Sequence, residues 1–281
     1  MTVLMAMNTA GASQIAMKHG LTGPNMTIST ACSSAAVAIG EACRLIRHGY
    51  ADVMIAGGAE ALLTEGTLAA WAALRTLASV DADDPAASCR PFSRDRSGLV
   101  LGEGAAIVVL EAADRALARG APVHAELIGF GMSNDVHHIA HPSVEGQVRA
   151  MRAALADAAI APREIDYLNA HGTATLVGDR VETAAIKEVF GDHAYRVPVS
   201  STKAVHGHMM GATAAAEFIA AVLAIKQRAV PPTANLRVPD PECDLDYIPN
   251  ESRKKNVEFA VCSSIAFGAK NSAIVLKAYR D

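Results

Sequence analysis

Apolar residues along the chain follow two alternating patterns, which predict strands and helices in turn. Short aliphatic runs predict strands at 25–31, 52–57, 104–110, 124–132, 165–169, 196–200, 258–265 and 272–278. Apolar positions at helical spacing predict helices at 9–19, 33–48, 111–119, 145–159, 179–190 and 211–227. This regular alternation of the two element types predicts an α/β fold.

Two of the predicted helices are apolar on too many sides to lie at a surface. The helix at 33–48 is surrounded by Ala35, Ala36, Ala38, Ile39, Ala42 and Ile46. The helix at 211–227 repeats this composition. We therefore expect both helices to be buried in the centre of a layered fold, where small side chains allow close approach to neighbours.

Composition and charge narrow the class of protein. The 281 residues are 51% hydrophobic, 19% charged and 4% aromatic, which indicates an aliphatic globular chain. With 25 basic and 29 acidic residues the net charge is -4, so nothing global favours nucleic acid or membrane as a partner. No apolar run is expected to span a bilayer, and the start does not read as a secretory signal. Five cysteines without a paired motif favour reduced thiols in the cytoplasm.

Cys32 is the first candidate for chemistry. It lies where the predicted strand at 25–31 meets the predicted helix at 33–48, so its sulfur is expected at a helix N-terminus. The unpaired N–H groups of a first helical turn stabilise an anion and lower a thiol pKa, which would make Cys32 a nucleophile at neutral pH. The alternative is a small buried cysteine with no reaction, a common role among alanines.

Two histidines lie at further predicted strand ends. His171 follows the predicted strand at 165–169, and His208 follows the one at 196–200. In open α/β sheets the carboxyl ends of strands line the ligand crevice. We therefore expect Cys32, His171 and His208 to converge on one site, however far apart they are in sequence.

Four short motifs carry a resemblance to a known family. They read TACSS at 30–34, AHGTAT at 170–175, STK at 201–203 with GH at 207–208, and AFGAKN at 266–271. In this order and spacing the chain resembles the β-ketoacyl-acyl-carrier-protein synthases, the condensing enzymes of fatty acid and polyketide synthesis. Further segments agree, namely ADVMIAGGAE at 51–60, RPFSRDR at 90–96 and GEGA at 102–105. The resemblance covers essentially the whole chain and implies a thiolase-like fold of α/β/α/β/α layers in two duplicated halves.

The resemblance also implies how the chain is divided. Residues 1–119 would be the remainder of an N-terminal half that carries the nucleophile, and residues 120–281 a C-terminal half that carries both histidines. Members of the family are longer, so the first half is expected to be truncated, either genuinely or through a misassigned start. In the family the opening third contributes dimer contacts and part of the acyl pocket.

A two-step condensation is what the resemblance implies for the chemistry. Cys32 would take the acyl group from an acyl-carrier-protein thioester as an S-acyl enzyme. His171 and His208 would donate hydrogen bonds to the malonyl thioester oxygen while decarboxylation forms the attacking enolate. The backbone N–H groups of Cys32 and Phe267 would form the oxyanion hole. No cofactor or metal is implied, because phosphopantetheine arrives on the acyl carrier protein.

Further residues are expected around this set. The charged residues expected to support the histidines are Lys203, Glu217, Asp179 and Glu182. They would set the charge of the site or form buried ion pairs that order its loops. Thr173 and Thr175 would bind the phosphopantetheine arm, and Phe267 would gate the acyl pocket. Arg75 would help to bind the substrate on its carrier.

Several positions depart from the family pattern. The family's Gly-Phe-Gly-Gly turn is replaced by a segment with Ala269 and Lys270, and an added β-carbon disfavours left-handed backbone there. His206 stands where the family commonly has threonine and is expected as a loop residue. The loop histidines His137, His138 and His141 lack the cysteine or carboxylate spacing that would support a metal site.

Two alternatives remain at this stage. A thiolase acting on coenzyme A thioesters would have a second cysteine near Phe267 and Lys270, which this chain lacks. A catalytically inactive truncated homologue, or a partner subunit of a condensing enzyme, is the other alternative, although Cys32 and both histidines are retained. We expect a cytoplasmic homodimer, or a heterodimer with another synthase subunit, with no nucleic acid or membrane partner.

Overall fold

The computed structural model describes residues 2–136 and 138–280. Its helices are α1 Thr2–Ala6, α2 Ala10–His19, α3 Ser34–Arg47, α4 Glu65–Ala73, α5 Ala113–Ala118, α6 Val144–Asp157, α7 Leu176–Phe190, α8 Lys203–His206 and α9 Thr213–Gln227. Its strands are β1 Val53–Glu60, β2 Gly104–Glu111, β3 Glu126–Asn134, β4 Tyr167–Asn169, β5 Val199–Ser200, β6 Ala229–Val230, β7 Arg253–Lys254, β8 Phe259–Ala266 and β9 Lys270–Lys277. Every predicted helix is present, and so is every predicted strand except the first.

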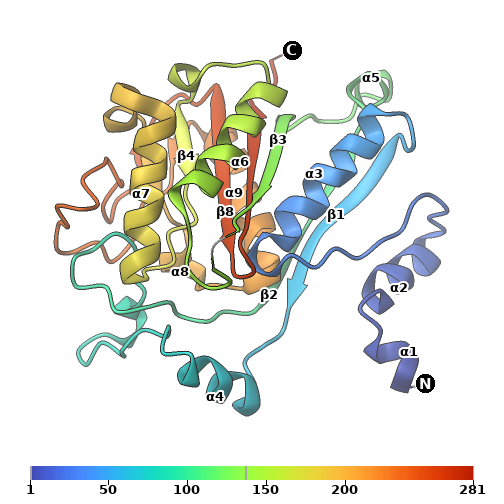
Figure 1. Cartoon of the computed structure of the whole chain (residues 1–281). Coiled ribbons are helices and arrows are strands. Elements are labelled where there is room, and N and C mark those ends of the chain that lie inside the picture. Colours follow the sequence, from blue (N-terminus) through green and yellow to red (C-terminus); the bar gives the residue numbers. More distant parts are fainter. Residues whose placement is uncertain (1, 137, 281) are drawn as a thin grey trace.

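The elements stack in layers (Figure 1). Five strands form a mixed sheet in the order β3-β9-β8-β4-β5. Helices α6 and α7 cover one face of this sheet, and α3 and α9 cover the other. Beyond α3 and α9, strands β1 and β2 pair antiparallel as a separate two-stranded sheet. The α/β class is confirmed, and the described residues supply an α/β/α/β stack.

The five-stranded sheet separates two apolar cores. Successive residues of β8 and β9 point to opposite faces, as the two-residue period of a strand requires. Val261 and Val275 pack in the cluster with α6 and α7, whereas Ala260 and Ile274 pack in the cluster with α3 and α9. Helices α3 and α9 thus lie between two sheets, which confirms their predicted central position.

The parallel strands bring distant parts of the chain to one edge. Strand β4 is parallel to both β5 and β8, so the carboxyl ends of all three lie on the same side. His171 follows β4, His208 lies beyond β5, and Phe267 follows β8 directly. The predicted convergence of strand ends therefore holds for the two histidines.

The predicted strand at 25–31 is absent from the described residues. That segment has no regular secondary structure up to residue 30 and forms no ladder, and most of it is exposed, with Met26 at 50%. Aliphatic composition alone does not make a strand, because the backbone N–H and C=O groups need a neighbouring strand to pair with. The segment leads into a 3₁₀ turn, Ala31–Ser33, which carries Cys32.

One segment, Met210–Gln227, contradicts the expectation that no apolar run could span a bilayer, since its length and hydropathy suffice. Over half of this segment is buried inside the fold, where α9 packs between the two sheets. Its Glu217 is 1% exposed and forms an ion pair with Lys203. Buried core helices can be as long and as apolar as membrane-spanning ones, so the apolar composition of this segment reflects its burial between the two sheets.

Candidate active site

A strained turn places Cys32 just before α3. Ala31 has a φ of 50°, a left-handed conformation that is uncommon for a residue with a β-carbon. The Ser34 hydroxyl donates a hydrogen bond of 2.7 Å to the Ala31 carbonyl and closes the turn. The Ser33 hydroxyl donates one of 3.0 Å to the carbonyl of Ser264 in β8. These bonds fix the sulfur beside the carboxyl end of β8.

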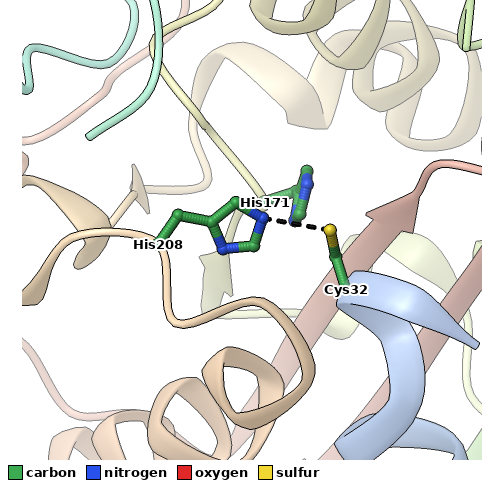
Figure 2. A group of neighbouring side chains, drawn as sticks. All are labelled: Cys32, His171 and His208. Carbon is green, nitrogen blue, oxygen red and sulfur yellow. Dashed lines mark hydrogen bonds between the residues drawn. The ribbon is translucent and has the colours of Figure 1, made fainter. Parts of the chain in front are cut away.

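Cys32, His171 and His208 meet in one buried cluster (Figure 2). The Cys32 Sγ and His208 Nε2 atoms are 3.1 Å apart. The two imidazole rings lie edge to face, with centroids 5.4 Å apart and planes at 85°. One side-chain atom of each residue lies within 4.8 Å of the other two. The structure thus brings together the three side chains that the sequence predicted to converge.

Both imidazoles are neutral at pH 7. Burial, followed by the positive charge of Lys203, lowers the pKa of His171 and of His208 well below 6.5. A neutral imidazole offers one N–H donor and one acceptor nitrogen. The pair can therefore donate hydrogen bonds to a developing oxyanion without carrying charge at rest.

The pKa of the Cys32 thiol is raised, whereas the sequence predicted that it would be lowered. Burial raises the pKa of this thiol to about 11, against the opposing effects of the Lys203 charge and of backbone N–H groups. Helix α3 begins two residues later, at Ser34, and its first turn does not outweigh the desolvation of the sulfur. The prediction that the helix N-terminus lowers the pKa of the Cys32 thiol is therefore wrong.

The predicted oxyanion-hole donors do lie at the sulfur. The backbone N–H groups of Phe267 and of Cys32 itself are close enough to lower the thiol pKa. Both come from elements that are fixed by other contacts, namely the turn after β8 and the turn before α3. A tetrahedral oxyanion formed at the acyl carbon on Cys32 would meet two such donors.

The turn after β8 adopts left-handed backbone despite its alanine. Gly268 and Ala269 have φ values of 81° and 66°. The β-carbon of Ala269 disfavours this conformation by only about 1–2 kcal/mol, so other contacts can hold it. The Gly268 N–H donates a hydrogen bond of 2.8 Å to the Ile139 carbonyl. The Asp135 N–H donates one of 2.7 Å to the Ala269 carbonyl. These two bonds hold the strained turn and Phe267 in place.

Glu182 holds the backbone of the first histidine loop. Its carboxylate accepts the N–H groups of His171 at 2.7 Å and Gly172 at 2.8 Å, and the Ser263 hydroxyl at 2.7 Å. Burial raises the pKa of Glu182, and these three donors oppose the shift. The residue contacts the loop that carries His171 and not its imidazole.

Lys203 and Glu217 form an ion pair beneath the site, with the lysine 0% exposed. Burial raises the pKa of Glu217, and the charge of Lys203 opposes that rise. The positive charge of Lys203 also lowers the pKa of both imidazoles. This pair thus orders α8 against α9 and sets the charge near the histidines.

Asp179, another predicted supporting residue, is fully buried and bonds to a different part of the chain. Its Oδ2 accepts the Phe92 N–H at 2.7 Å and lies 3.4 Å from Nε of Arg96. Burial raises the pKa of Asp179 to about 7, although Arg96 opposes the shift. It therefore joins the segment before β2 to the start of α7, and hydrogen-bonds to neither histidine.

A cavity of about 300 Å³ opens onto the cluster. Its lining includes the predicted residues Cys32, His171, His208, Thr173, Thr175, Asp179, Glu182, Phe267 and Arg75. The hydroxyl oxygens of Thr173 and Thr175 are 3.1 Å apart. Phe267 stacks on Trp71, with ring centroids 5.9 Å apart. Arg75 is exposed at the rim of this cavity.

Sequence reasoning missed several residues of the site. The Thr213 hydroxyl oxygen lies 2.9 Å from Nδ1 of His208, and the Met210 Sδ lies 3.8 Å from Cys32 Sγ. Trp71 contacts Phe267 from α4, a helix that the apolar pattern did not predict. In the sequence, only one feature could have pointed to Thr213: it is a hydroxyl residue among the alanines that follow His208.

The other histidines that the sequence singled out are His206 and the loop residues His137, His138 and His141. His206 hydrogen-bonds to the Thr202 hydroxyl at 3.0 Å and to the Gly207 carbonyl at 2.7 Å, and burial lowers its pKa to about 4. His138 and His141 stack with ring centroids 4.0 Å apart. His137 lies outside the described residues.

Comparison with known proteins agrees with this geometry. The model for the "Beta-ketoacyl synthase, N-terminal domain" matches residues 1–116, and that for the "Beta-ketoacyl synthase, C-terminal domain" matches residues 124–237. Nodulation protein E of Rhizobium meliloti is 50% identical over 276 residues, which cover 98% of this chain and 67% of that protein. The 3-oxoacyl-[acyl-carrier-protein] synthase 2 of Coxiella burnetii is 46% identical over 269 residues, which cover 95% of this chain and 65% of that protein. The chain thus spans about two thirds of the length of these relatives.

Solved structures show the same fold. A type II PKS ketosynthase, solved with its acyl-carrier protein and bound to the hexaketide, has a TM-score of 0.95 at 37% identity, over 97% of this chain and 67% of its own. A β-ketoacyl synthase from Burkholderia phymatum has a TM-score of 0.92 at 38% identity, and the match covers 97% of this chain and 66% of that one. The predicted thiolase-like fold is confirmed. By sequence and by fold, the chain belongs to the β-ketoacyl synthase family.

Proposed function

We propose that this chain is a condensing enzyme that joins an acyl thioester to a malonyl thioester on acyl carrier protein, in fatty acid or polyketide-like synthesis. The observation that carries the proposal is the buried Cys32, His171 and His208 cluster, with Cys32 Sγ 3.1 Å from His208 Nε2. Relatives named 3-oxoacyl-[acyl-carrier-protein] synthase 2, and a ketosynthase solved with its acyl-carrier protein, support it.

The first step transfers the acyl group to Cys32. The sulfur bonds to the acyl carbon, the bond from that carbon to the carrier's pantetheine sulfur breaks, and the thiol proton of Cys32 passes to the departing sulfur. The backbone N–H groups of Cys32 and Phe267 stabilise the tetrahedral oxyanion. No group is oxidised or reduced, so the step needs no bound cofactor.

The second step forms the carbon–carbon bond. The malonyl carboxylate leaves as carbon dioxide, and its electron pair forms an enolate on the thioester. Hydrogen bonds from His171 and His208 to the thioester oxygen stabilise that charge. The enolate carbon attacks the acyl carbon on Cys32, and the expelled sulfur regains a proton from solvent. The product is a β-ketoacyl thioester on the carrier.

The cavity supports a role for the carrier's phosphopantetheine arm. Hydroxyls of Thr173 and Thr175 line the cavity and can bond to amides of the arm. Arg75, exposed at the rim of the cavity, would meet the carrier's negative charge. The chain would then need no cofactor of its own. A homodimer or a heterodimer with another synthase subunit, in the cytoplasm, completes the proposal.

Intact-mass measurement after incubation with acyl-carrier thioester tests this function. Wild-type protein should gain the acyl mass, whereas Cys32→Ala should gain none. His208→Ala should still be acylated but should release no carbon dioxide from malonyl carrier, because the enolate loses one of its two donors. Cys43→Ala, which changes a half-buried cysteine elsewhere on α3, should behave like wild type.

Two results would overturn the proposal. A wild-type chain that never gains acyl mass would identify a non-catalytic subunit or remnant. Acetylation by acetyl coenzyme A without carrier protein, followed by transfer to a second coenzyme A thioester, would identify a thiolase.

A further inference from the structure

His208 makes one hydrogen bond through each of its ring nitrogens. Its Nε2 lies 3.1 Å from Cys32 Sγ, and its Nδ1 lies 2.9 Å from the hydroxyl oxygen of Thr213. Because burial keeps the imidazole neutral, only one of these nitrogens carries hydrogen. Which nitrogen carries it decides whether His208 donates to the reacting groups or accepts from them.

Thr213 is positioned to determine which nitrogen of His208 carries the hydrogen. It is the first residue of α9, it is 1% exposed, and its preceding turn, Met210–Ala212, is packed against β1. A buried hydroxyl hydrogen needs an acceptor, because leaving it unpaired costs about 1–3 kcal/mol. In the described part of the chain the Thr213 hydroxyl has a single hydrogen-bond partner, which is Nδ1 of His208.

Only one assignment satisfies every group in this series. If Nδ1 carried the hydrogen, the Thr213 hydroxyl hydrogen would point to no acceptor among the described residues. If Nε2 carries it, the Thr213 O–H donates to Nδ1, and the Nε2–H donates to Cys32 Sγ. The Cys32 S–H then donates to the thioether of Met210, 3.8 Å away. Each hydrogen has an acceptor and each acceptor one hydrogen.

We propose that Thr213 is a positioning residue that holds His208 in the tautomer with hydrogen on Nε2. The Nε2–H then faces the sulfur at rest and is free to bond to the malonyl thioester oxygen once Cys32 is acylated. The role of this donor in catalysis rests on the proposed function, but the tautomer itself does not.

The test of the tautomer needs no substrate. Long-range ¹H–¹⁵N spectra of protein labelled in histidine nitrogen distinguish the two neutral forms, and the His208→Gln spectrum assigns the signals of His208. Wild type should show hydrogen on Nε2 at pH 7. Thr213→Val, which keeps the shape but removes the hydroxyl that selects Nε2, should show a mixture of the two neutral forms, and Thr213→Ser should restore the wild-type signal.

Kinetics then connect the tautomer to the reaction. Decarboxylation of malonyl carrier by acylated enzyme should fall roughly five- to tenfold in Thr213→Val, the effect of losing one uncharged hydrogen bond. Thr213→Ser should keep most of the rate. Thr183→Val removes another buried hydroxyl, which bonds to Tyr247 at 2.5 Å, and serves as the control for destabilisation alone. It should leave the His208 signals unchanged.

Hydrogen on Nδ1 in the wild type would overturn the proposal. So would an unchanged tautomer and decarboxylation rate in a folded Thr213→Val protein. If wild type shows the expected tautomer but never condenses thioesters, the positioning by Thr213 stands and the proposed function fails.

Discussion

At the scale of single residues, the site pairs a thiol and an imidazole whose pKa values move apart. Burial raises the pKa of Cys32 to about 11 and lowers that of His208 well below 6.5. A proton on the sulfur therefore does not transfer to the imidazole at rest, and the pair is a neutral thiol beside a neutral donor.

This pairing predicts the pH dependence of Cys32 alkylation. A thiol with a raised pKa is protonated at neutral pH, so the reaction with iodoacetamide should speed up about tenfold per pH unit from pH 7 to 10. Peptide mass analysis of the Cys32 site measures the rate, with Cys32→Ala as the blank for the other cysteines. A rate that is already flat below pH 8 would show a stabilised thiolate instead.

At the scale of elements, the position of the sulfur depends on how closely α3 approaches its neighbours. Alanines line the buried face of this helix, and Gly40 lies directly against the ring of Phe130 in β3. A β-carbon built on Gly40 would come within 2.4 Å of that ring. Since Cys32 lies in the turn that leads into α3, the packing of this helix also places the nucleophile.

Gly40→Ala should therefore lower the melting temperature. The added methyl forces α3 and β3 apart, which typically costs about 1–3 kcal/mol in a packed core. Gly66→Ala is the matched control, because Gly66 also lies in a helix, α4, but its β-carbon would meet nothing within 4 Å. Calorimetry should show a loss for Gly40→Ala alone. Equal melting temperatures would mean that the Phe130 ring moves aside freely.

At the scale of the whole molecule, the stack of layers ends in an apolar face. Strands β1 and β2 turn Ala56, Met54 and Val108 inward against α3 and α9. On the outer side Ile55, Ile107 and Val109 are 40%, 48% and 63% exposed. A contiguous exposed aliphatic surface on a sheet favours association with other molecules.

Charges on this outer face should reduce self-association. In the double variant Ile107→Lys with Val109→Glu, both side chains face solvent in β2, so the fold should be retained while association falls. Sedimentation velocity measures the association, and circular dichroism the fold. Val108→Lys, on the inner side of the same strand, should unfold the protein instead. Unchanged association in the double variant would show that another surface is responsible.

Much of the fold and of the site was predictable, because local patterns report local structure. The periodicity in α6, β8 and β9 predicted those elements to within a few residues. Motif order predicted that His171 and His208 lie beside Cys32, because the ends of parallel strands share one edge. The division of the chain near residue 119, and the roles of the site residues, stay predictions.

By itself the sequence determined most of the segments that become helices and strands, and which side chains stand at their ends, since both depend largely on residues near in the chain. Only the tertiary structure decided the rest. The segment at 25–31 pairs with no other strand, and the thiol of Cys32 is buried away from water. Thr213 lies within hydrogen-bond distance of His208. Each of these outcomes depends on which distant groups pack around a residue, and packing is a property of the assembled molecule.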